Sequence, residues 1–254
     1  MKTYDNTTLL VAAAGMATRM ESGDTPKALV KFKGRALIDW ATCAFTPYVK
    51  KMQIVIRRET FPDFSSYYEN SESQGVHFVY QNEPLGTGYA IRDGLSSIDT
   101  EWVLTVWGDH VGASRAKIPE IFATMESIKG DFYLPLVSKK NPYVYFEISE
   151  DGSLLKFHET NLGASKVIEG FSDCGFFLFK REIVSEFLEM YLSCKTKEPI
   201  VEVNFLSLFS DMEKSGIKFH KIFLEDELLT LGINTPSEIR SLEEEFNLEE
   251  PNGQ

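Results

Sequence analysis

The sequence predicts an α/β fold, with a doubly wound, mixed and mostly parallel sheet that carries helices on both faces. Apolar runs of strand length recur in the first half of the chain, and segments of helical spacing separate them, an alternation that favours βαβ units. The 254 residues are 43% hydrophobic and 25% charged, which is enough to bury a core. The expected strands of this half are Leu9–Ala14, Met52–Ile56, Val76–Tyr80 and Trp102–Val106.

The segments that follow these strands carry the expected helices. Ala36–Phe45 and Thr87–Leu95 have helical spacing, and residues 60–71 fit a helix that begins near Pro62. A further helix is expected at Ile118–Ile128. Pro119 stands in its first turn, where proline is tolerated because the first amides of a helix have no partner within it.

The second half is richer in strands and is expected to form the second wall of a cleft. Asp151-Gly152 is typical of a hairpin turn, and Thr235 is placed to cap the last helix. No linker or repeat divides the chain, so residues 1–254 are expected to form one domain with a frayed tail at 247–254. The expected strands are Phe132–Val137, Val144–Ser149, Leu154–His158, Phe171–Phe179 and Ile217–Leu224, and the expected helices are Arg181–Leu192, Val201–Ser215 and Pro236–Phe246.

Charge and composition narrow the partners and the compartment. The net charge of −12 disfavours nucleic acid as a partner. No apolar run reaches the ~18 residues that a membrane span needs, and the N-terminus lacks the apolar core of a signal peptide. Cys43, Cys174 and Cys194 are odd in number and widely separated, which indicates a reducing compartment. We therefore expect a cytoplasmic protein, and the oligomeric state stays open.

The first strand runs into a loop that is suited to an anion. Ala13, Ala14 and Gly15 lie at its carboxyl end, where open α/β sheets bind ligands and where small residues let backbone amides come close to a phosphate. Arg19 and Lys27 add two cations to the same stretch. Glycines are missing from the positions that a dinucleotide fingerprint requires, and no G-K-[ST] of a P-loop occurs. The stretch instead favours a triphosphate.

Two more loops follow strands of the same sheet. Gln81, Gly86 and Thr87 come after the third strand; the glutamine can read a base edge, the glycine permits close approach, and the threonine is placed to cap the next helix. Asp109 follows the fourth strand, where a carboxylate can hold Mg²⁺ against phosphates. An aspartate in that position can equally serve as a helix cap.

These motifs together resemble the sugar-1-phosphate nucleotidyltransferases, and most closely the N-acetylglucosamine-1-phosphate uridylyltransferase domain. The resemblance rests on A-A-G-M-A-T-R-M, on P-K-A-L, on the loop Q-N-E-P-L-G-T-G, on W-G-D and on the late G-I-N. It implies a Rossmann-like sheet and Mg²⁺ held by Asp109 and Asn234. It also implies that Arg19 and Lys27 act on the phosphates, with the base at Gln81, Gly86 and Thr87. Ala17 and Tyr89 depart from the pattern.

The resemblance also places a sugar subsite in the second half of the chain. It implies that Tyr143, Glu159 and Asp173 contact the sugar. The glycines usual around Tyr143 are missing, and Asp173 replaces an asparagine, which changes an amide into a group that only accepts hydrogen bonds. The identity of the sugar therefore stays open.

Three functions remain in view from the sequence. The first joins a nucleoside triphosphate, with UTP favoured, to a sugar-1-phosphate and releases pyrophosphate. The second is a cytidylyl- or guanylyltransferase with another phosphorylated acceptor such as choline-phosphate, whose cation could face Tyr143, Tyr145 and Phe146. The third is a protein that binds a nucleotide-sugar without turnover.

Overall fold

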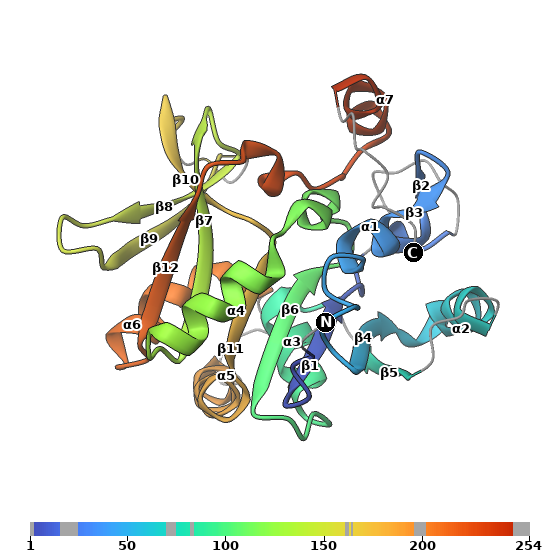
Figure 1. Ribbon diagram of the computed structural model, residues 1–254, viewed down its shortest axis with the longest axis horizontal. Coiled ribbons are helices and arrows are strands. Elements are labelled where there is room, and N and C mark those ends of the chain that lie inside the picture. The colour runs from blue at the N-terminus through green and yellow to red at the C-terminus, as the bar shows by residue number, and fades with distance from the viewer. Residues whose placement is uncertain are drawn as a thin grey trace.

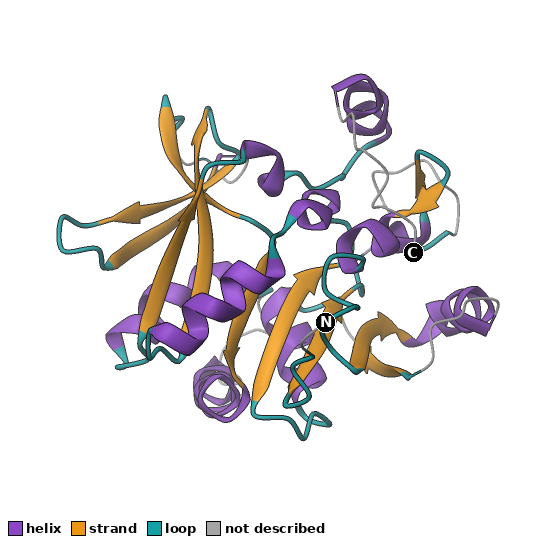
Figure 2. Ribbon diagram, viewed as in Figure 1, coloured by secondary structure: helices purple, strands orange, loops and turns teal. Residues whose placement is uncertain are grey.

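A ten-stranded mixed sheet runs through the centre of the computed structural model, with helices on both of its faces (Figures 1 and 2). The strand order is β5-β4-β1-β6-β11-β7-β10-β8-β9, and β12 pairs with β7 beside this path. The structure describes residues 3–15, 25–69, 75–81, 84–160, 163, 165–195 and 202–245. The predicted fold class is confirmed.

The first half of the sheet is parallel. It consists of β1 (Thr7–Ala12), β4 (Lys51–Arg57), β5 (Val76–Gln81) and β6 (Trp102–Trp107), each within a few residues of its expected bounds. β1 lies between β4 and β6, and β5 extends the sheet beyond β4. Because these strands all run the same way, the loops that follow β1, β5 and β6 meet at one edge of the sheet.

Alternating side chains of β1 feed two cores, one on each face of the sheet. Leu10 packs with α3 (Thr87–Leu95), while Leu9 and Val11 pack with α1 (Leu37–Thr42), α2 (Phe61–Glu69) and α4 (Ile118–Ser127). A strand buried on both faces reads as a continuous apolar run, which is why these strands were visible in the sequence. The helix expected at Ala36–Phe45 is shorter than predicted, because the chain leaves helical geometry for turns after Thr42.

The second half of the sheet is largely antiparallel. Its strands are β7 (Phe132–Lys140), β8 (Val144–Ile148), β9 (Leu154–Glu159), β10 (Glu169–Asp173), β11 (Phe176–Lys180) and β12 (Phe219–Leu224). β8 and β9 form the expected hairpin, with Gly152 of its turn at φ +85°. β11 pairs with β6 and also with β7, so it joins the two halves.

The single strand predicted at Phe171–Phe179 is wrong, because the structure breaks it into β10 and β11. The break falls at Cys174 and Gly175, and Gly175 has φ +70°. A Cβ on Gly175 would stand 2.3 Å from the ring of His110, so only glycine lets the chain pass that side chain. The break lets one chain segment pair with β7 and β8 through β10 and then with β6 and β7 through β11.

The helices of the second half differ in how well the sequence predicted them. α5 (Arg181–Lys195) and α7 (Pro236–Glu245) lie where they were expected. Thr235 caps α7 as predicted: its hydroxyl accepts from the Glu238 amide at 3.2 Å, while the Glu238 carboxylate accepts from the Thr235 amide at 3.0 Å. The tail at 247–254 lies outside the described residues.

The helix predicted at Val201–Ser215 is wrong in its first part. Residues 202–204 are not helical; a 3₁₀ helix, η5 (Phe205–Leu208), precedes α6 (Phe209–Lys214), and Val201 lies outside the described residues. The backbone of Val203 is used elsewhere, because its amide donates to the Leu85 carbonyl and its carbonyl accepts from the Gly88 amide. Those bonds hold residues 202–204 against the loop before α3.

Among the described residues, no helix has the length and apolar character needed to cross a lipid bilayer.

Candidate active site

A pocket of about 710 Å³ opens at the edge where β1, β5 and β6 end, and both halves of the chain line it. Every predicted site residue other than Arg19 contributes to its wall. Arg19 lies outside the described residues. The residues brought together are Ala13, Ala14, Gly15, Lys27, Gln81, Gly86, Thr87, Asp109, Tyr143, Glu159, Asp173 and Asn234.

The floor of the pocket is the end of β1. The Ala13 amide donates to the Val55 carbonyl at 2.9 Å, and the Gly108 amide donates to the Ala12 carbonyl at 3.0 Å. These bonds hold the ends of β1, β4 and β6 together. A Cβ on Gly108 would come within 3.1 Å of Ala13, whereas a Cβ on Gly15 would meet nothing within 4 Å. The space beside Gly15 is therefore open.

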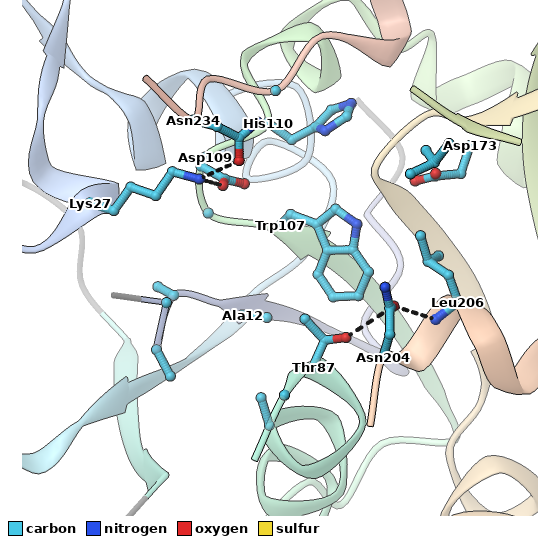
Figure 3. Close-up of a pocket in the computed structure, with 18 of the residues that line it drawn as sticks. Ala12, Lys27, Thr87, Trp107, Asp109, His110, Asp173, Asn204, Leu206 and Asn234 are labelled. Carbon is cyan, nitrogen blue, oxygen red and sulfur yellow. Dashed lines mark hydrogen bonds and ion pairs between the residues drawn. The ribbon is translucent and has the colours of Figure 1, made fainter. Parts of the chain in front are cut away.

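Three polar side chains from distant parts of the chain converge above this floor (Figure 3). Lys27 lies in the 3₁₀ helix η1 (Lys27–Leu29), and its Nζ donates to Asp109 Oδ2 and, at 2.8 Å, to Asn234 Oδ1. The Ile233 amide donates to the Asp109 carbonyl at 3.0 Å, which holds Asn234 beside the end of β6. The sequence separated these groups by more than two hundred residues, and the fold makes them one cluster.

The pair Asp109 and Asn234 suits a magnesium ion. Their side-chain oxygens both accept from the Lys27 ammonium. A metal cation in the place of that ammonium would contact the same two oxygens. Mg²⁺ prefers oxygen ligands and is commonly held by one or two carboxylates together with substrate phosphates. Within the described residues, no group of three or more His, Cys, Asp or Glu side chains forms a metal cage. The residues present fit an ion that shares its ligands with a substrate.

The loop before α3 forms the next wall, and it is closely packed. Gln81 is buried, and its Nε2 donates to the Gly86 carbonyl at 3.0 Å. Gly86 has φ +90°, and a Cβ there would lie 2.5 Å from the Val203 carbonyl oxygen. Both the backbone conformation and the space therefore require glycine at this position. The Glu202 side chain also packs against Gly86.

Thr87 does not cap its own helix, so that prediction is wrong. The N-cap of α3 is Gly86, and no side chain caps the helix. The Thr87 hydroxyl instead accepts from the Phe205 amide at 2.8 Å, because η5 begins close by and its first amide lacks a partner within that helix. Thr87 therefore joins the two walls of the pocket at this point.

The wall of the pocket where a sugar was expected from the sequence is formed by the ends of β8, β9 and β10. The Tyr143 hydroxyl donates to Glu159 Oε1 at 2.9 Å. The aromatic trio considered for a cationic acceptor does not form there. Tyr145 is buried and stacks on His158, and Phe146 is buried and stacks on Phe209. Of the three aromatic residues, Tyr143 alone lines the pocket.

Asp173 and His110 are two buried ionisable side chains in the wall of the pocket. The Asp173 carboxylate accepts from the Gly175 amide at 2.9 Å, and a His110 ring nitrogen lies 2.9 Å from the Leu229 carbonyl. Burial raises the pKa of Asp173, and the nearby His110 opposes that shift. Burial likewise lowers the pKa of His110, while Asp173 acts in the opposite direction.

Sequence reasoning missed several residues that line the pocket. Trp107 and His110 flank Asp109, so the motif that singled out the aspartate could have included them. Lys139 left no such signal. It lies one residue before the end of β7, and its Nζ donates to Thr230 Oγ1 at 2.7 Å, a contact across ninety-one positions that only the fold creates.

Comparisons with known proteins agree with this geometry. The family described as "MobA-like NTP transferase domain" matches residues 9–171. The chain is 25% identical over 247 residues to the bifunctional protein GlmU of Caldicellulosiruptor saccharolyticus, covering 95% of this chain and 52% of that protein. It is 22% identical over 251 residues to GlmU of Mycobacterium bovis, covering 95% and 50%. The chain thus spans about half the length of the curated relatives it matches.

The fold also resembles solved structures at low sequence identity. HddC from Yersinia pseudotuberculosis, complexed with GMP-PN, superposes with a TM-score of 0.67 at 18% identity, and the match covers 94% of this chain and 99% of that one. This likeness establishes the fold.

Proposed function

The chain belongs to the MobA-like NTP transferase domain family, and on this basis we propose that it joins a nucleoside triphosphate to a sugar-1-phosphate, releasing pyrophosphate. The observation that carries the proposal is the convergence of Lys27, Asp109 and Asn234 in one pocket at the carboxyl edge of the parallel strands. A cation, a carboxylate and an amide oxygen at such an edge suit a polyphosphate with a divalent ion.

The proposed reaction needs no nucleophile from the protein. A phosphate oxygen of the acceptor attacks the α-phosphorus, the bond from that phosphorus to the bridging oxygen breaks, and pyrophosphate leaves with the electron pair. The attacking phosphate is already an anion, so catalysis consists of positioning and charge neutralisation. Lys27, with Arg19, neutralises the charge that gathers on the α-phosphate and the leaving group. Mg²⁺ held by Asp109 and Asn234 would supply further neutralisation.

The nucleotide lies along the first half of the chain in this proposal. Ala13, Ala14 and Gly15 border the phosphates, and the open space beside Gly15 leaves room for them. Gln81, Gly86 and Thr87 border the base. We favour UTP because the motifs of this chain resemble those of the N-acetylglucosamine-1-phosphate uridylyltransferase domain.

The acceptor lies against the second half. Tyr143, Glu159 and Asp173 present oxygens that can accept from sugar hydroxyls, and they come from three adjoining strand ends. A choline-phosphate acceptor is less well supported, because a cationic head group is usually held by several aromatic faces and this pocket offers only Tyr143 of the three expected.

A different base is the best-supported alternative. HddC was solved with GMP-PN, so a fold of this kind accommodates guanine in at least one protein. The Gln81 side chain carries both a donor and an acceptor and therefore does not by itself select a base. A cytidylyl- or guanylyltransferase with the same Lys27 and Asp109 chemistry thus remains the second candidate.

The test is pyrophosphate release measured with UTP, CTP, GTP, ATP and dTTP, each with a panel of sugar-1-phosphates and choline-phosphate, with and without Mg²⁺. We expect release with UTP and one sugar-1-phosphate, and loss of release when Mg²⁺ is chelated. Release with another base would establish the second candidate. Tight nucleotide binding without release for any acceptor would instead favour a protein that binds a nucleotide-sugar without turnover.

A further inference from the structure

Lys139 is a cation on the acceptor side of the pocket, and the reaction described above does not use it. It lies at the end of β7, directly across from Gly170 of β10, and lines the same wall as Tyr143 and Asp173. Its Nζ donates to the Thr230 hydroxyl, which in turn donates to the Glu227 carbonyl at 2.8 Å. The ammonium is therefore held in place by a neutral group.

Comparison with the other half-buried lysines shows what is unusual about Lys139. Among the residues that the structure describes, Lys27, Lys180 and Lys221 are also half-buried, and each forms an ion pair with an aspartate or glutamate. Lys139 forms no ion pair with a described carboxylate. A cation partly removed from water and left without a counter-charge costs free energy, and an anion bound beside it would reduce that cost.

The neighbouring carboxylates do not fill that role. Burial lowers the pKa of Lys139, and the charges of Glu227 and Asp173 oppose the shift without reaching ion-pair distance. The Asp173 carboxylate is engaged with the Gly175 amide and lies beside His110. The amine therefore borders the pocket with its charge only partly balanced by the residues that the structure describes.

The chain sets an upper limit on the distance from the partner of Lys139 to the phosphate end of the pocket. Thr230, the partner of Lys139, lies four residues before Asn234, and an extended chain of that length spans at most about 14 Å. A small acceptor whose reacting group faces Lys27 and Asp109 would therefore bring its other end, or the edge of its phosphate, close to Lys139.

We propose that Lys139 binds an oxyanion of the acceptor, an inference that rests on the proposed function in placing the acceptor in this part of the pocket. The oxyanion is either the reacting phosphate or a second acidic group on the same molecule. Around Lys139, the acidic side chains Glu159 and Asp173 accept hydrogen bonds, so the acceptor combines donors such as hydroxyls with one negative group. Lys139 is thus a residue that selects and positions the acceptor.

The experiment measures binding by calorimetry with Mg²⁺ and the α,β-methylene analogue of UTP, which cannot release pyrophosphate, and again without nucleotide. The probes are glucose-1-phosphate, glucuronic acid-1-phosphate and glucuronic acid. The variants are Lys139→Met, which keeps the apolar stem, Lys139→Arg, which keeps the charge, and Lys140→Met as a control on the exposed neighbouring lysine.

We expect Lys139→Met to weaken binding by about 10- to 100-fold, as for the loss of one charged hydrogen bond, while Lys139→Arg and Lys140→Met stay within about threefold of wild type. Equal weakening of both phosphorylated probes would identify the reacting phosphate as the bound group. Weakening of the glucuronic acid compounds alone would identify a second acidic group. Either pattern supports the proposal.

Unchanged binding of every probe to Lys139→Met would overturn it, and so would the absence of measurable binding of any probe to the wild-type protein at millimolar concentration. Failure of the proposed function looks different. In that case the wild-type protein binds the probes in a manner that depends on Lys139, yet releases no pyrophosphate with any nucleotide.

Discussion

Replacing Lys27 with alanine should have two effects, one on the rate of pyrophosphate release and one on the binding of Mg²⁺. The ammonium contacts both Asp109 and Asn234, and it is the described cation at the end of the pocket where the phosphates are placed. Its loss removes one preorganised charge from the transition state, for which mutagenesis elsewhere gives about 2.7–4 kcal/mol, or 10²- to 10³-fold in kcat. We expect a loss of that size in pyrophosphate release.

The same substitution should strengthen the binding of Mg²⁺, although it weakens catalysis. Without nucleotide, Lys27 occupies the oxygens that Mg²⁺ would use, so its removal should tighten Mg²⁺ binding to the free protein by at least about tenfold, as expected for the loss of a positive charge a few ångströms from the ion. Calorimetry with Mg²⁺ alone measures this, and Mn²⁺ can replace Mg²⁺ where a spectroscopic signal is needed.

The matched control is Lys31→Ala, which removes an exposed lysine close by in the sequence and should leave both quantities unchanged. Because the Asp109 side chain is 27% exposed, its freed carboxylate should lower the free energy of unfolding by no more than about 1 kcal/mol. If Lys27→Ala kept near-normal turnover, or bound Mg²⁺ more weakly, the account of this cluster would be refuted.

Three other changes test separate parts of the structure. Gly86→Ala must place a methyl group against a carbonyl oxygen at a left-handed backbone angle, so thermal unfolding should show a loss of about 1–3 kcal/mol, whereas Gly15→Ala, with open space around it, should lose much less. Burial lowers the pKa of Lys139, so the charged side chain reduces the stability of the folded protein at pH values below its folded-state pKa. This cost becomes smaller as the pH rises toward 10.5. Urea unfolding should therefore find Lys139→Met more stable than wild type at pH 7, with a smaller gain at pH 10. Burial also raises the pKa of Cys174, so a thiol reagent should modify the exposed Cys194 in the native protein and reach Cys174 only after unfolding; prompt native modification of both would contradict the burial.

The sequence predicted the parallel half of the fold well because its signals are local. A strand buried on both faces is largely apolar, and the runs Leu9–Ala12 of β1 and Trp102–Trp107 of β6, the latter interrupted only by Thr105, show this directly in their residues. The turn at Gly152 and the cap at Thr235 are also local, since each depends on hydrogen bonds within a few residues. Loops at the ends of parallel strands must meet at one edge, so the sequence also predicted that Lys27 and Asp109 would lie together.

Long-range contacts decided the features that the sequence left out or predicted wrongly. Gly175 breaks a strand because the ring of His110 occupies the space where a side chain would go, and the two residues are far apart in the chain. Residues 202–204 leave the helical pattern because Leu85, just before α3, and Gly88, at its start, take up the backbone hydrogen bonds of Val203. No local sequence pattern predicts such contacts, because the packing of the whole sheet determines which residues meet.

In the pocket, the sequence predicted the residues proposed to bind phosphates better than those proposed to bind the acceptor. The residues suited to binding phosphates come directly after strands that can be recognised in the sequence. Because those strands are parallel, the residues after them meet at one edge of the sheet. The acceptor side depends on which side chains a twisted antiparallel sheet turns inward. That packing buries Tyr145 and Phe146, leaves Tyr143 at the pocket, and brings Lys139 to Thr230 with no carboxylate of the described residues at ion-pair distance. None of this is encoded in a stretch short enough to read locally.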